Sequence, residues 1–172
     1  SKFFNPLKNT YTFFQMYANI DNIDPRNFKV ATSDLENIDK WLLSKYNKLI
    51  KNVTSAYEEY DLNKVVKLVT EFVSDDLSNW YIRRNRKRFW QSELDNSKMS
   101  VYQTTYEVLI GICKIVAPIS PFITEEIYQN LTDEESVHLA SFPIPDEKLI
   151  NEELENKMEL VRNLISLGRN RS

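Results

Sequence analysis

Glycine is nearly absent from this chain, because only two occur among its 172 residues, at positions 111 and 168. Strands need tight turns, and tight turns often need glycine, while the β-branched residues here are scattered rather than set in alternating runs. The composition therefore argues against a protein built from strands and predicts an all-α fold.

Cysteine and histidine are equally scarce, because Cys113 and His138 are the single representatives of their types. A lone cysteine excludes an internal disulfide, and neither residue can build a thiolate or histidine metal site. No glycine-rich phosphate loop is present, and the paired glutamates are consecutive, so they point apart on a helix. We expect no catalytic residue, no metal and no other cofactor in this chain, and we interpret His138 as a loop residue with local hydrogen bonds.

Long apolar runs are also missing. No stretch approaches the roughly 20 apolar residues that span a bilayer, and no signal-peptide pattern occurs. With 42% apolar and 27% charged residues, the chain should instead bury the core of one globular domain, and we expect a cytoplasmic location. The net charge of −3 means that any nucleic-acid site must be local.

Apolar residues recur at helical spacing through most of the chain. The spacing predicts helices over 1–20, 35–60, 62–91, 99–117, 125–131 and 151–168. We expect Ser33 or Asp34 to cap the second helix and Asp61 to cap the third. Two long helices joined by a turn this short must pack antiparallel, so the prediction is an antiparallel bundle of four to five helices with helix 62–91 the best buried. Helical patterns that start and stop abruptly favour a segment of a longer polypeptide.

One stretch concentrates charge and aromatic side chains, and we call residues 75–90 the basic aromatic segment. Two of the three tryptophans lie in it, at 80 and 90. Five basic residues occur within six positions: Arg83, Arg84, Arg86, Lys87 and Arg88. Cations that bind phosphates and aromatic rings that stack on bases are what a reader of a single-stranded RNA loop requires.

Two interpretations of the basic aromatic segment remain open from the residues alone. Helical spacing continued from Val69 and Val73 puts one set of positions on the inward face: Asp76, Trp80, Arg83, Arg84 and Lys87. These arginines and the lysine would then pair with carboxylates inside the bundle. Arg86 and Arg88 are equally compatible with either role. We expect the part around Asp76, Trp80 and Arg83 to be core, and the part around Arg86, Arg88 and Trp90 to face RNA.

Several motifs resemble a known family. The segment Asp39-Lys40-Trp41-Leu42-Leu43-Ser44-Lys45 is similar to the one that opens the anticodon-binding domain of class Ia aminoacyl-tRNA synthetases. Residues 117–128 and 136–139 match the same family further along the chain. Residues 3–11 and 78–90 resemble its isoleucine-specific members, and the similarity covers nearly the whole chain in the right order.

The resemblance implies a tRNA anticodon stem-loop binding domain of an enzyme that ligates isoleucine to its tRNA using ATP. ATP, and zinc where the enzyme carries a zinc-binding tail, would be held elsewhere in the parent enzyme, so this chain alone should be catalytically inert. Its expected partners are tRNA(Ile) and the catalytic and C-terminal domains of the same polypeptide. Residues 1–20 would form the helix leaving the catalytic domain, 35–148 the anticodon-binding bundle, and 149–172 a helix leading to the C-terminal region.

The candidate residues follow from both lines of reasoning. The candidates for tRNA binding are Arg83, Arg84, Arg86, Arg88, Phe89 and Trp90. The candidates for the structural core are Trp41, Trp80 and Asp76. Two alternatives remain: the equivalent domain of a valyl- or leucyl-tRNA synthetase, and a helical protein–protein interaction module with no RNA role.

Overall fold

The computed structural model describes residues 4–171, and within this range the chain is helical with no strand. The α-helices are α1 (Phe4–Asp21), α2 (Asn37–Glu58), α3 (Leu62–Glu71), α4 (Arg86–Trp90), α5 (Asn96–Val116), α6 (Pro121–Leu131) and α7 (Glu152–Arg171). A π-helix covers Phe72–Ile82, and short 3-10 turns cover Pro25–Asn27, Thr32–Asp34, Val137–Leu139 and Glu147–Leu149. The prediction of an all-α fold is confirmed.

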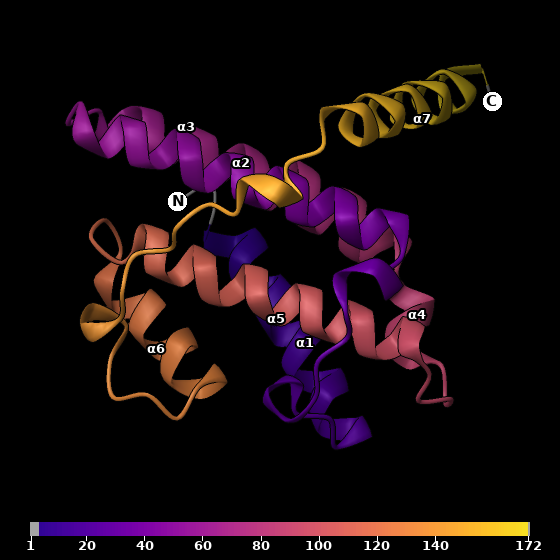
Figure 1. Ribbon diagram of the computed structural model, residues 1–172, viewed down its shortest axis with the longest axis horizontal. Coiled ribbons are helices and arrows are strands. Elements are labelled where there is room, and N and C mark those ends of the chain that lie inside the picture. The colour runs from indigo at the N-terminus through magenta and orange to yellow at the C-terminus, as the bar shows by residue number, and fades with distance from the viewer. Residues whose placement is uncertain (1–3, 172) are drawn as a thin grey trace.

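The helices pack as a bundle around α2 and α5 (Figure 1). Helix α2 contacts α3, α5 and α7, while α5 contacts α1, α4 and α6. In Figure 1, α2 and α3 lie side by side above α5, and α1 passes behind α5. Helix α7 extends away from the body of the bundle, and Glu155 is the one residue described in it that is buried. None of the helices within 4–171 has the length and apolar character needed to cross a membrane.

Local capping explains where the helices begin. Helix α2 starts after a capping box in which Glu36 and Asp39 exchange side-chain and backbone hydrogen bonds. The prediction of Ser33 or Asp34 as this cap is wrong, because both lie in a separate 3-10 turn. Asp61 caps α3 as predicted, accepting from the Lys64 backbone N–H at 3.0 Å.

The predicted helix over 62–91 is interrupted. It is α-helical to Glu71 and π-helical from Phe72 to Ile82, and it breaks at Asn85 before the five residues of α4. A π-helix bonds residue i to i+5, so each turn takes up about one residue more than an α-turn. The face that looks inward is therefore shifted along the sequence beyond this segment. This helix is also not the best buried, because α5 buries 13 of its 21 residues.

Helices α2 and α5 approach closely at Gly111. A Cβ atom at this position would overlap the hydroxyl end of the Tyr46 ring, which lies on α2. Glycine is therefore required here by the packing of a neighbouring ring and not by backbone conformation. This contact lets the two central helices approach each other closely.

Candidate nucleic-acid interface

In α4, the side chains of the basic aromatic segment lie on two opposite faces, one buried and one exposed. Phe89 is fully buried and Arg88 is only 8% exposed, whereas Trp90 is 59% exposed. The remaining basic side chains of the segment are all exposed: Arg83, Arg84, Arg86 and Lys87. The division expected from the sequence, with a buried first part and an exposed second part, is therefore not the one observed.

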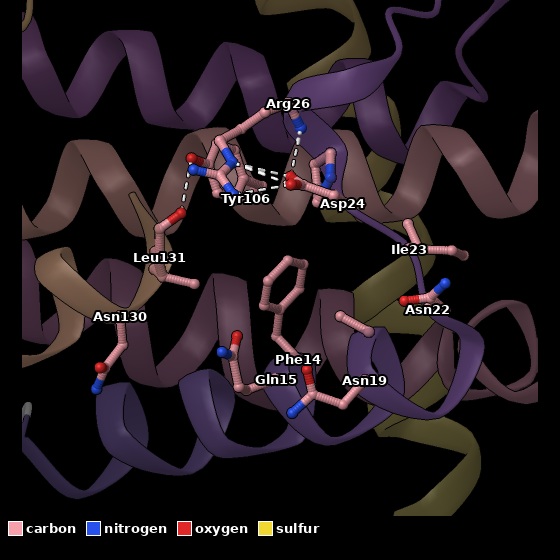
Figure 2. A pocket seen from close by; sticks show the side chains of 12 residues that line it. Phe14, Gln15, Asn19, Asn22, Ile23, Asp24, Arg26, Tyr106, Asn130 and Leu131 are labelled. Carbon is pink, nitrogen blue, oxygen red and sulfur yellow. Dashed lines mark hydrogen bonds and ion pairs between the residues drawn. The ribbon is translucent and has the colours of Figure 1, made fainter. Parts of the chain in front are cut away.

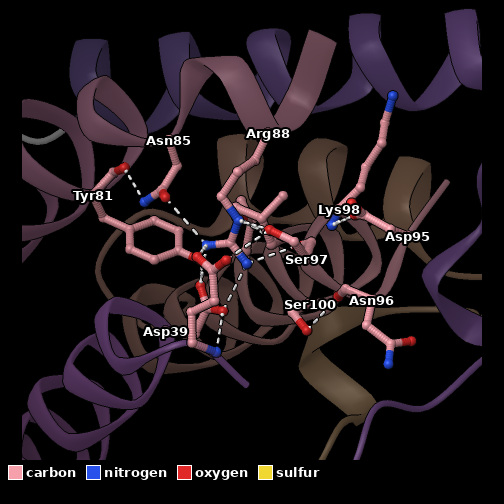
Figure 3. A network of polar contacts seen from close by, with 12 residues as sticks. Asp39, Tyr81, Asn85, Arg88, Asp95, Asn96, Ser97, Lys98 and Ser100 are labelled. Carbon is pink, nitrogen blue, oxygen red and sulfur yellow. Dashed lines mark hydrogen bonds and ion pairs between the residues drawn. The ribbon is translucent and has the colours of Figure 1, made fainter. Parts of the chain in front are cut away.

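Arg88 lies in a buried polar network (Figure 3). Its Nη1 and Nη2 atoms donate to the two carboxylate oxygens of Asp39, each at 2.8 Å. Nη2 also donates to the Ser97 carbonyl at 2.6 Å, and Nη1 to the Asn85 side-chain oxygen at 3.1 Å. The assignment of Arg88 to tRNA binding is therefore corrected, because its guanidinium nitrogens bond to groups inside the protein.

The network keeps Arg88 charged. Burial by itself disfavours the guanidinium cation, but hydrogen bonds to Asp39 and the nearby charge of Glu36, at 3.2 Å, raise the pKa of Arg88 overall. The Tyr81 hydroxyl donates to Asp39 Oδ1 at 2.5 Å. Burial, followed by the charge of Asp39, raises the pKa of Tyr81 well above its usual value, so the hydroxyl keeps its proton.

Phe89 is part of the aromatic core between α1, α4 and α5. Its ring lies 5.0 Å from that of Phe13 and 5.1 Å from that of Tyr102, both in edge-to-face orientation. A side chain enclosed in this way has no face left for a nucleobase. The assignment of Phe89 to tRNA binding is therefore also corrected.

The structure places the core candidates Trp41, Trp80 and Asp76 in the interior, near Arg162 of α7. The Trp80 ring has the Arg84 guanidinium at 4.4 Å and the Arg162 guanidinium at 5.2 Å. Arg162 donates to Asp76 at 2.7 Å. Asp76 is therefore paired with Arg162 of α7 and, at 3.7 Å, with Lys45 of α2, and not with Arg83. Burial raises the pKa of Asp76, although the charges of Lys45 and Arg162 oppose that shift.

The outward side of the segment presents cations without competing carboxylates. Among residues 4–171, the side chains of Arg83, Arg86 and Lys87 make no ion pair or hydrogen bond. Arg84 stacks on Trp80 and the exposed indole of Trp90 lies at the end of α4. Unpaired guanidinium and ammonium groups suit phosphate oxygens, and an exposed indole suits an unstacked base.

Sequence periodicity did not predict where the side chains of Lys87, Asp39 and Lys98 lie. Lys87 was expected on the inward face but is exposed on α4. Lys98 is a fully buried cation, paired with Asp21 at 2.7 Å. The apolar character of Phe89, which breaks the inward pattern assumed for the segment, is the signal that could have revealed the shifted face.

A polar cavity of about 260 Å³ lies on another part of the surface, between α1, α5 and α6 (Figure 2). The Phe14 ring points into it, and Asp24 and Arg26 stand on its rim. The Arg26 guanidinium is bidentate to Asp24, with Nε donating to Oδ1 and Nη2 to Oδ2, and it also pairs with Asp133 at 2.5 Å. Hydrogen bonds from Arg26 lower the pKa of Asp24 despite some desolvation, so both partners stay charged. Because two carboxylates already satisfy Arg26, this cavity is poorly suited to phosphate.

Comparison with known proteins is consistent with this geometry. A family model described as "Anticodon-binding domain of tRNA ligase" matches residues 39–171. Proteins named isoleucine–tRNA ligase are similar over almost the whole chain. The one from Bacteroides thetaiotaomicron is 44% identical over 96% of this chain, that from Dehalococcoides mccartyi 44% over 95%, and that from Clostridium tetani 45% over 98%.

The chain belongs to the family of anticodon-binding domains of tRNA ligases. Its resemblance to the class Ia synthetases, inferred from sequence motifs, is thereby confirmed. The chain spans 15% to 17% of the lengths of these three relatives.

Proposed function

We propose that this domain binds the anticodon stem and loop of tRNA(Ile) as part of a longer isoleucine–tRNA ligase. The observation that carries the proposal is the outward side of the basic aromatic segment, where Arg83, Arg86 and Lys87 are unpaired within residues 4–171 and Trp90 is exposed. The similarity to isoleucine–tRNA ligases supports isoleucine over the valine and leucine enzymes.

The domain would contribute to catalysis by positioning and not by chemistry. Phosphate contacts from Arg83, Arg86 and Lys87 would fix the orientation of the anticodon stem, and Trp90 would stack on a base of the loop. Binding energy gained here holds the far end of the tRNA in place, which lowers the entropy cost of reaction at a distant centre. Isoleucine activation with ATP would take place outside residues 1–172, in the cytoplasm where tRNAs are charged.

The test is discrimination between tRNAs. The full-length polypeptide containing these residues should be titrated with tRNA(Ile) and with an elongator tRNA of different anticodon, at several salt concentrations. We expect tighter binding of tRNA(Ile) at every salt concentration, since electrostatic contacts weaken for both RNAs while base contacts do not. Equal affinity for the two tRNAs throughout would reject anticodon recognition and leave the helical protein–protein module as the better explanation.

A further inference from the structure

Helix α4 is too short to hold its own conformation. It contains five residues, and isolated helices of fewer than about 12 residues are marginal in water. It follows a break at Asn85, so it is not a continuation of the preceding helix. The direction of its exposed side chains must therefore be set by contacts on its buried side.

Arg88 ties α4 to two other elements. Its bidentate pair with Asp39 reaches the first turn of α2, and its bonds to the Ser97 carbonyl at 2.6 Å and the Ser97 hydroxyl at 3.0 Å reach the first turn of α5. Ser97 in turn donates to Glu36 at 2.8 Å, which closes the link between the two helices. A planar guanidinium makes all of these contacts in one orientation only.

Lys98 holds the C-terminal end of α4. Its side chain is fully buried, and its ammonium group donates to the carbonyl of Gln91, the residue that caps α4. Its counterion is Asp21 at the end of α1, at 2.7 Å, and Asp21 also accepts from the Tyr102 hydroxyl at 2.8 Å. A cation at a helix C-terminus stabilises the unpaired carbonyls there.

We propose that Arg88 and Lys98 are positioning residues for RNA binding, two buried cations that hold α4 at its middle and at its C-terminal end and so set the direction of Arg86, Lys87 and Trp90. The inference rests on the proposed function, because it concerns the same surface. Neither cation touches RNA: Arg88 is nearly buried and Lys98 has no exposed side-chain surface. Both act through the outward side chains, whose ordering before binding reduces the entropy lost in the complex.

The test uses Lys98→Met in the full-length polypeptide, with Lys157→Met as the matched control. Both changes remove one positive charge, but Lys157 lies exposed on α7 and pairs only with Glu153, at 3.1 Å, among the described residues. Arg88→Lys is the second variant, since it keeps the charge and removes the fork that joins α2 to α5. Each protein is assayed for tRNA(Ile) affinity, for the salt dependence of binding, and for amide exchange over residues 83–95 relative to the core.

We expect Lys98→Met and Arg88→Lys each to weaken tRNA(Ile) binding about tenfold, which corresponds to the loss of ordering of two or three contact side chains. Exchange over residues 83–95 should accelerate more than exchange in the middle turns of α2 and α5. The salt slope should stay at the wild-type value because no phosphate contact is removed. Lys157→Met should remain within about twofold, because a distant exposed charge is screened.

Three results would overturn the inference. One is faster exchange in α4 with affinity within twofold of wild type, which would make the two cations merely structural. Another is an equal loss of affinity in Lys157→Met, which would make the effect one of net charge. The third is a wild-type protein that does not distinguish tRNA(Ile) from another tRNA, which would overturn the proposed function and this inference together.

Discussion

Arg86 and Arg88 lie two residues apart in the same short helix, yet their surroundings are opposite. Arg88 is nearly buried and bonds to a carboxylate 49 positions away in the sequence, while Arg86 is exposed and unpaired within the described part of the chain. Two residues on a helix are separated by about 200°, so one faces the core when the other faces solvent. A run of basic residues is therefore not one site, because the helical face decides which of its members are available to a partner.

The two tryptophans of the segment extend this contrast to large aromatic side chains. We expect Trp80→Ala to lower the free energy of unfolding by about 3–5 kcal/mol, because it leaves a cavity between Arg84 and Arg162. Trp90→Ala should change it by less than about 0.5 kcal/mol, since its side chain is largely exposed. Urea unfolding monitored by circular dichroism measures both free energies. Similar decreases for the two variants would show that the buried and exposed tryptophans do not differ in their contribution to stability.

The two arginines give the next largest difference. Arg88→Met should lower the free energy of unfolding by about 3 kcal/mol, since Asp39 is then buried without its cation. Arg86→Met should leave stability within about 0.5 kcal/mol of wild type. If Arg86→Met is as destabilising as Arg88→Met in the same denaturant titration, then Arg86 stabilises the fold, and the contrast between a buried Arg88 and an exposed Arg86 is wrong.

The two glycines also differ in their surroundings, because Gly111 is packed against a neighbouring ring and Gly168 is not. Gly111→Ala should cost about 1–3 kcal/mol, because the added methyl group collides with Tyr46 and the ring must move. Gly168→Ala should instead be neutral or slightly stabilising, as nothing lies within 4 Å of the added atom and alanine is the better helix former. Thermal melting of the two variants separates them by sign.

The smallest expected effect is a pH dependence at the tyrosines. Burial raises the pKa of Tyr57 to about 12, and its hydroxyl donates to the Ile115 carbonyl at 2.6 Å. A raised pKa means that this contribution to stability is complete below the unfolded-state pKa of about 10 and is lost as the pH rises to 12. Tyr57→Phe should flatten the fall in unfolding free energy over this range.

Much of the architecture could be predicted because it depends on local pattern. The helical spacing of apolar residues located α1, α2, α5, α6 and α7 to within a few residues, and Asp61 was recognisable as a cap because aspartate accepts from free backbone N–H groups. Tertiary contacts could not be predicted from the sequence pattern in the same way. The bonds of Arg88 to Asp39 join residues that no local periodicity relates.

The misplacement of Arg83, Arg84 and Lys87 has one physical cause. Periodicity extended from Val69 and Val73 assumes an α-helix throughout, whereas the chain is π-helical over Phe72–Ile82. The additional residue taken up by π-turns, together with the break at Asn85, moves the inward face from Lys87 to Arg88 and Phe89. No proline or glycine lies in this segment to signal the change, so the apolar residue Phe89 was the sign of the shifted face that the sequence offered.

In the proposed complex, the outward side of α4 contacts RNA phosphate and its inward side does not. The most direct measurement is the affinity for tRNA(Ile) as a function of salt for the wild type and for the double variant Arg86→Met with Lys87→Met. We expect weaker binding and a log–log salt slope smaller by about one unit for each phosphate contact removed, with unchanged thermal stability. An unchanged slope and affinity in a stably folded double variant would contradict it.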